Sequence, residues 1–177
     1  AASDVYKRQK VQSVEKWSMT IHRLFSKDPN DEEENVTQNI YVFRFILFCI
    51  IVYSFEMLLN SVDIFIVDKT IFTRGYVTGC LFAAVYVLIL LHLGLEHPLT
   101  KYVSITAVSL IIMAASVSLT YHMIIIIMMP IIIAGMYTSK QLSIYTFVLT
   151  VLSIIISTYA GYYYGVCDAV SYTHLTL

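Results

Sequence analysis

The stretch from Tyr102 to Val166 constrains the fold most strongly, because Lys140 is its only charged side chain. A water-soluble domain cannot bury so long an apolar run in one piece, whereas a bilayer accommodates ~20 mostly apolar residues per helical crossing. The composition agrees, since 58% of the residues are hydrophobic and 13% are charged, and the mean hydropathy is +0.75. The sequence therefore predicts an all-α integral membrane protein.

Polar interruptions divide the apolar sequence, residues 40–166, into a predicted bundle of five transmembrane helices. Inside the long run, the cut from Leu119 to His122 is so short that the flanking helices should form a tight antiparallel hairpin. The cut from Thr138 to Gln141 is a short polar turn. The predicted helices cover residues 40–62, 75–95, 102–120, 121–137 and 142–164.

Both ends of the chain look foreign to the protein. Residue 1 is alanine rather than methionine, and residues 1–9 and 170–177 resemble the translated sequencing adapter found at the ends of metagenomic reading frames. Such segments are excluded from fold analysis. We therefore expect a fragment whose natural sequence continues past Asp168.

Residues 10–39 are predicted to be a cytoplasmic amphipathic helix followed by an acidic linker. Apolar residues recur at helical spacing between Val11 and Phe25, with basic residues among them and Trp17 expected at headgroup depth. A solvated helix fits the same pattern. The acidic run from Asp28 to Asn35 has no glycine to form a calcium-binding turn, which favours a solvated linker.

The positive charges predict the orientation of the helices. With the N-terminus inside, the cytoplasmic side has six basic residues outside the helices and the outer side has two. The inner six are Lys10, Lys16, Arg23, Lys27, Lys101 and Lys140, and the outer two are Lys69 and Arg74. We therefore expect a multi-pass protein of the bacterial inner membrane with a cytoplasmic N-terminus.

Ionisable side chains inside or at the ends of the predicted helices are the first candidates for function. Glu56 is such a candidate because carboxylates are costly in a membrane, although hydration near the interface also explains it. Arg44 lies near a helix start and can reach the headgroups. His92 and Glu96 stand at i and i+4, which predicts a hydrogen-bonded helix end rather than a metal site.

Two further helices have distinctive compositions. Pro130 lies in the middle of the short fourth predicted helix, where it frees a backbone carbonyl and should produce a kink. The kink marks either a moving part or ordinary packing. The third predicted helix is rich in small and hydroxyl residues from Ser104 to Ser118, which favours close helix approach.

Catalytic motifs are missing from the sequence. It has no glycine-rich phosphate loop, no GxSxG or HExxH motif and no paired membrane carboxylates. No basic, aromatic patch for nucleic acid is present either. We therefore predict no catalytic, cofactor-binding or metal-binding residue in this chain.

Several features between Tyr121 and Ala169 are distinctive in combination. They are Tyr121-His122, the mid-helix Pro130, the turn Met136-Tyr137-Thr138-Ser139-Lys140, Tyr145-Thr146, and the sequence GYYYGVCDA from Gly161 to Ala169. Together they resemble the last part of the N-terminal multi-helix membrane domain of clostridial-type GGDEF proteins.

The resemblance implies that a sixth helix and a cytoplasmic diguanylate cyclase follow this fragment. That module would condense two GTP molecules into cyclic di-GMP with magnesium, and the chain itself would be the sensing and anchoring half. A homodimer in the lipid bilayer is implied as well. Tyr121, His122, Cys167 and Asp168 are then the candidates for contact with an unknown signal.

Two other functions remain open. The chain fits a fragment of a multi-pass transporter or channel, or the membrane domain of a sensor histidine kinase. A GG[DE]EF motif after a sixth helix would distinguish the cyclase from the kinase, which has a phosphoacceptor-histidine helix and an ATP lid. Transport would require uptake that is lost when Glu56 is replaced.

Overall fold

The computed structural model describes residues 15–25, 34–64, 68–119 and 124–163, and the regular elements in these ranges are all helices. Four of them are long and apolar enough to cross a membrane. They are α2 (Glu34–Ser61), α3 (Lys69–Leu93), α4 (Thr100–Leu119) and α7 (Lys140–Tyr163). The predicted all-α class is confirmed, and four apolar helices support a membrane protein.

The fourth predicted helix is present in two short pieces. They are α5 (Ile124–Ile127) and α6 (Met129–Gly135), separated at Met128. From Ile124 to Gly135 the two pieces rise only about 18 Å at 1.5 Å per residue. That is less than the ~30 Å hydrocarbon core, so the predicted count of five complete crossings is not confirmed.

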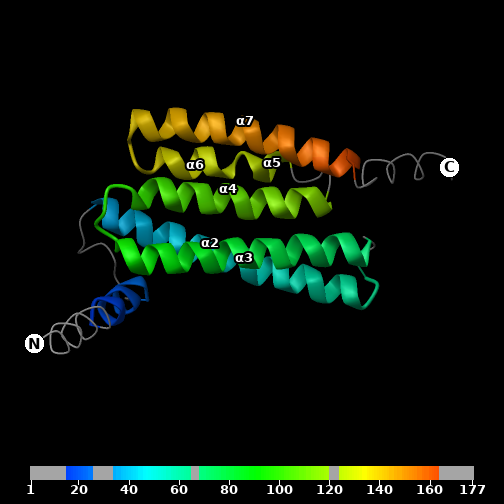
Figure 1. The fold of residues 1–177 in the computed structure, drawn as a ribbon, viewed down its shortest axis with the longest axis horizontal. Helices are drawn as coiled ribbons and strands as arrows, with labels where there is room; N and C mark the ends of the chain where they lie inside the picture. Colours follow the sequence, from blue (N-terminus) through cyan, green and yellow to red (C-terminus); the bar gives the residue numbers. More distant parts are fainter. Residues whose placement is uncertain (1–14, 26–33, 65–67, 120–123, 164–177) are drawn as a thin grey trace, which may run out of the picture.

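The helices lie side by side and alternate in direction (Figure 1). At one end of the bundle α2, α4 and α7 begin while α3 and α6 end, and we call it the proximal end. At the other, distal end α2 and α4 end while α3 and α5 begin (Figure 1). Helix α4 lies in the middle, because it contacts α2, α3, α5, α6 and α7.

Small side chains on α4 explain its central position. Most of its span is buried, whereas less than a third of the spans of α2, α3 and α7 is buried. Its buried residues include Ser104, Ala107, Ser109, Ala114, Ala115, Ser116 and Ser118. Short side chains let neighbouring backbones approach closely, so the composition of the third predicted helix is explained by packing.

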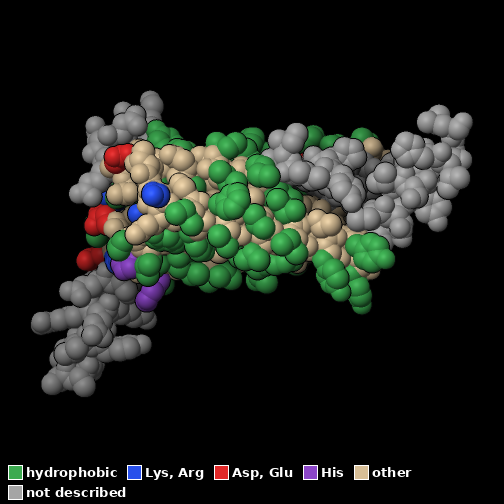
Figure 2. Space-filling view, turned by 90° about the horizontal axis from the view of Figure 1, so that it is seen from above, with side chains coloured by type: hydrophobic (Ala, Val, Ile, Leu, Met, Phe, Trp, Pro, Cys, Tyr) green, Lys and Arg blue, Asp and Glu red, His purple; other side chains and the backbone are tan. Residues whose placement is uncertain are grey.

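Large apolar side chains cover much of the outside of the bundle, and on the face shown in Figure 2 the charged groups gather at the proximal end. Phe48 and Phe55 of α2, Leu88 of α3 and Phe147 of α7 are each about 60% exposed or more. Exposed apolar surface of this extent is what a lipid environment solvates favourably. The distribution supports an orientation of the helices across a bilayer.

Two helices begin earlier than the sequence predicts. Helix α3 starts at Lys69 rather than at residue 75, because the Asp68 carboxylate accepts hydrogen bonds from the backbone N–H groups of Thr70 and Ile71, both 2.9 Å. A capping aspartate of this kind satisfies N–H groups that have no partner in the first turn. Helix α2 starts at Glu34 rather than at residue 40, so the end of the predicted linker is helical.

Candidate functional site

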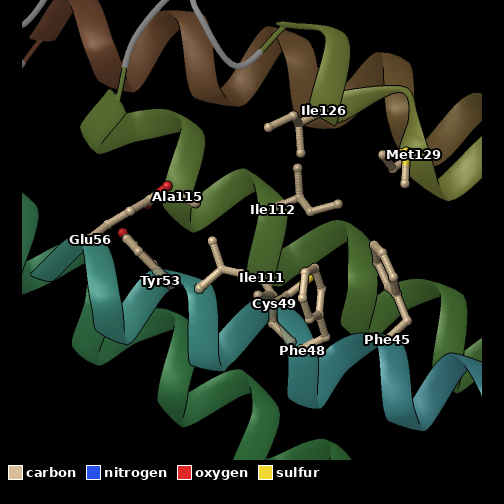
Figure 3. A pocket seen from close by; sticks show the side chains of 11 residues that line it. Phe45, Phe48, Cys49, Tyr53, Glu56, Ile111, Ile112, Ala115, Ile126 and Met129 are labelled. Carbon is tan, nitrogen blue, oxygen red and sulfur yellow. The ribbon is translucent and has the colours of Figure 1, made fainter.

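A groove runs between α2 on one side and α5 and α6 on the other, with α4 as its floor (Figure 3). Its volume is about 250 Å³. Apart from the Glu56 carboxylate, the Tyr53 hydroxyl and the sulfur atoms, its surface is hydrocarbon. The lining residues are Phe45, Phe48, Cys49, Val52, Tyr53, Glu56, Ile111, Ile112, Ala115, Ile126 and Met129.

Among the described residues that line the groove, Glu56 is the only charged one. It lies one and a half turns before the end of α2, and its side chain points toward α4 near Ala115 (Figure 3). The side chain is half-buried. Within the part of the chain that the structure describes, its carboxylate has no hydrogen bond and no ion pair.

The break beside Pro130 forms part of the opposite wall. Proline has no N–H to donate, so the regular ladder is interrupted there. Instead, the N–H of Ile131 donates to the carbonyl of Met128 at 3.0 Å, across one tighter turn. Ile126 before the break and Met129 after it both line the groove. The helix is therefore interrupted next to Pro130, where the sequence predicts a kink.

A buried polar cluster joins α2 to the end of α6 at the proximal end. Asn39, which is 2% exposed, donates from Nδ2 to the carbonyl of Leu95 at 2.8 Å and accepts from the Tyr137 hydroxyl at 2.8 Å. Gln38 donates from Nε2 to the carbonyl of Met136. We call these five residues the proximal polar cluster, and it holds α2 and α6 together at the same end.

A second cluster joins α2 to α3 and α4 near the distal end. The Tyr53 hydroxyl lies 2.9 Å from Ser118 Oγ, and the Tyr53 ring makes edge-on contacts with Phe72 and Tyr76, with centroids 5.3 and 5.4 Å away. The Tyr76 hydroxyl lies 2.9 Å from Ser54 Oγ. We call these residues the distal cluster. The distal cluster fixes α2 against α3 and α4, but it includes no residue of α5 or α6, which form the opposite wall of the groove.

The segment before α2 is helical over residues 15–24 and is attached to the proximal end. Lys16 Nζ donates to the carbonyl of His92 at 3.1 Å, at the C-terminal end of α3 where a positive charge is favoured. Arg23 and Glu96 form an ion pair of 2.9 Å. These contacts fix the segment to the end of α3 and to the connection that follows it.

Much of the apolar face of this segment stays exposed, although the Phe25 ring makes an edge-on contact with Phe43 of α2, with centroids 5.9 Å apart. Leu24 is buried, whereas Trp17, Ile21 and Phe25 are 46%, 46% and 65% exposed and are spaced one turn apart. That distribution fits the predicted contact with a membrane surface, which stays a prediction. Arg44 donates from Nε to the carbonyl of Leu24 at 3.2 Å, and its predicted reach to the headgroups stays a prediction.

The predicted shared helical face of His92 and Glu96 is wrong. Helix α3 ends at Leu93, and Gly94 follows with a φ of 88°, which turns the chain away from the helix. Glu96 is therefore outside the helix and pairs with Arg23 instead of sharing a face with His92. In the described ranges no three metal-ligating side chains lie close enough to hold a metal ion.

The structure brings two of the predicted candidates to one place. Glu56 lines the groove, and buried Pro130 causes the break in its opposite wall. The other candidates, Tyr121, His122, Cys167 and Asp168, lie outside the described residues.

The proximal polar cluster and the role of Tyr53 were not predicted from the sequence. Gln38 and Asn39 fall at the end of the predicted region 10–39, before the first predicted membrane helix, and no role was predicted for them. Tyr53 is one of many tyrosines in this chain. Its role depends on partners in α3 and α4 that are distant in sequence, so no local pattern reveals it.

No family model matches this chain, and no curated protein or solved structure was found to match it significantly. The resemblance to the membrane domain of GGDEF proteins therefore stays a prediction.

Proposed function

We propose that this chain is the membrane-anchoring and sensory domain of a bacterial signalling protein in the cell membrane, with its N-terminus and proximal end in the cytoplasm. The observation that best supports this function is the groove, since it places an unpaired carboxylate opposite an interrupted helix. A sensor needs such a pair, namely a place for a signal and an element with two arrangements.

The elements around the groove differ in how firmly they are held. Helices α2, α3 and α4 are joined by the distal cluster, whereas α5 and α6 form a wall broken at Met128. The proximal polar cluster connects the end of α6 to Asn39 and Leu95. A change in the groove that shifts α5 and α6 would therefore act on this cluster and on α7, which follows α6 directly.

The proposed output is a diguanylate cyclase, which makes cyclic di-GMP from GTP with magnesium. Support for this output comes from the resemblance of the segment between Tyr121 and Ala169 to the membrane domain of GGDEF proteins. The same resemblance supports a homodimer, in which helix packing would control how two output domains meet.

The first test is recovery of the complete gene by long-read sequencing across both ends. We expect a further helix and then a GG[DE]EF motif. A phosphoacceptor-histidine helix would mean that the output domain is a kinase rather than a cyclase. Further membrane helices without a soluble domain would contradict the signalling function.

The second test is Pro130→Ala in the complete protein. Alanine restores the missing N–H donor and favours a continuous helix by about 3 kcal/mol, so the two pieces should join and cyclic di-GMP should change several-fold at constant membrane level. The matched control is Gly135→Ala in α6, where an added Cβ has no heavy atom within 4 Å. Equal cyclic di-GMP levels in the Pro130→Ala and Gly135→Ala variants would show that the break in the helix has no role in signalling.

A further inference from the structure

We propose that the groove binds a single-chain amphiphile with a cationic head, whose ammonium group pairs with Glu56 and whose hydrocarbon chain lies toward Phe45. The role of this molecule as a signal rests on the sensory function proposed above. Its binding does not, because binding is a property of the groove in this chain alone.

The carboxylate of Glu56 determines the charge of the head group. An unpaired carboxylate is costly in apolar surroundings, and a nearby cation offsets that cost. Neither an ion pair nor a hydrogen bond to Glu56 is found in the described ranges. The neighbouring Tyr53 hydroxyl is engaged with Ser118. An ammonium group supplies both the opposite charge and hydrogen-bond donors.

The rest of the groove determines the tail. Phe48, Ile112, Ile126 and Met129 surround it with hydrocarbon and a flexible thioether, which adapts to an irregular chain. From Glu56 to Phe45 the groove follows eleven residues of α2, or roughly 16 Å at 1.5 Å per residue. An extended dodecyl chain spans such a length.

The volume limits the ligand to one chain. About 250 Å³ is below the ~300–1,000 Å³ of pockets for drug-sized molecules. A long-chain primary amine fits this space, whereas a phospholipid with two acyl chains exceeds it. The groove should therefore distinguish a free amine from the ammonium head group of phosphatidylethanolamine.

Binding would act directly on the broken helix. The chain of the ligand would contact Ile126 and Met129 on either side of the break, opposite Cys49 of α2. The proximal polar cluster connects α6 to α2. Separation of the groove walls would therefore first stretch the hydrogen bonds of that cluster.

Cys49 provides a probe inside the groove, since it is partly exposed there. We would replace Cys80 and Cys167 by alanine and place the chain in nanodiscs of phosphatidylcholine. The rate of Cys49 modification by a maleimide is then measured with dodecylamine, with dodecyl sulfate and with dodecanol. We expect dodecylamine to slow the modification at least several-fold and the other two to have little effect.

The matched variants are Glu56→Gln and Asp63→Asn. Both remove one carboxylate near the distal end, but Asp63 is exposed and pairs with Lys69 at 2.7 Å. Protection by dodecylamine should disappear in Glu56→Gln and persist in Asp63→Asn. Native mass spectrometry of the same samples counts bound amine directly, so the result does not depend on the reactivity of Cys49.

Three outcomes would overturn the proposal. Equal protection by the three amphiphiles would show that the groove does not select a cation, and binding unaffected by Glu56→Gln would show that Glu56 is not its partner. Displacement of the amine by phosphatidylethanolamine nanodiscs would assign the groove to bilayer lipid. If the amine binds but leaves the output of the complete protein unchanged, the binding site stands and only the sensory function fails.

Discussion

Asn39 contributes more to the packing of the bundle than its place at the start of the apolar sequence suggests. Its side chain connects α2 to the segments that follow α3 and α6, since it donates to the Leu95 carbonyl and accepts from the Tyr137 hydroxyl. Asn39→Leu removes both bonds and leaves the buried Leu95 carbonyl without this donor, at ~1–3 kcal/mol, and the Tyr137 hydroxyl without its acceptor on α2. We expect a clearly lower thermal unfolding midpoint in detergent.

The control for this change is Gln141→Leu, which also replaces an amide near the proximal end but at an exposed position. Tyr137→Phe should fall between the two, because it removes only one of the two hydrogen bonds. If Asn39→Leu unfolds at the same temperature as Gln141→Leu, the proximal polar cluster does not hold α2 and α6 together.

Gly75 lies where α3 approaches α2 and α4 closely. A Cβ atom added at Gly75 would lie 2.8 Å from both Ser118 Oγ and the Tyr53 hydroxyl, and 3.1 Å from the carbonyl of Ala114. Gly75→Ala should therefore break the bond between these hydroxyls and destabilise the fold by ~1–3 kcal/mol, as overpacking does. Gly135→Ala meets nothing within 4 Å and should be neutral.

Chemical unfolding of both glycine variants in mixed micelles measures this difference. An unfolding midpoint for Gly75→Ala equal to that of Gly135→Ala would mean that α2, α3 and α4 separate easily. It would contradict the conclusion that the distal cluster fixes α2 against α3 and α4.

At the scale of elements, the segment over residues 15–24 depends on charge for its position. The Arg23–Glu96 pair is largely exposed on the Glu96 side, so it contributes about 0.2–1 kcal/mol. Arg23→Glu places two carboxylates together and should release the segment part of the time. The anisotropy of Trp17, the single tryptophan of the chain, would then fall.

The charge reversal Arg23→Glu with Glu96→Arg tests whether this pair is responsible. It should restore the anisotropy of the unchanged chain, and added salt should weaken the effect of the single variant. Anisotropy that stays high in Arg23→Glu would mean that Leu24 and the membrane hold the segment without the ion pair.

The sequence predicted α2, α3, α4 and α7 because each has an uninterrupted apolar run, and such runs depend only on neighbouring residues. Their starts were less predictable, since the start of α3 depends on one capping aspartate. Pro130 indicated the break for the same local reason. The groove was not predictable, because it requires Glu56 and Met129, which are distant in the sequence, to line the same space.

At the scale of the whole molecule, the distribution of charge predicts which end faces the cytoplasm. Lys16, Arg23, Lys101 and Lys140 lie at the proximal end, against Lys69 and Arg74 at the start of α3. An excess of Lys and Arg marks the cytoplasmic side of a membrane protein. We therefore expect the proximal end to be inside the cell.

Single cysteines at exposed Thr138 and Asp63 test this orientation, because the two positions lie at opposite ends of the bundle. In intact cells, with the native cysteines replaced by serine, a membrane-impermeant maleimide should label Asp63→Cys. Thr138→Cys should react only after the membrane is permeabilised. The reverse pattern would place the proximal polar cluster outside the cell, where a shift of α6 could not reach a cytoplasmic cyclase through that end of the bundle.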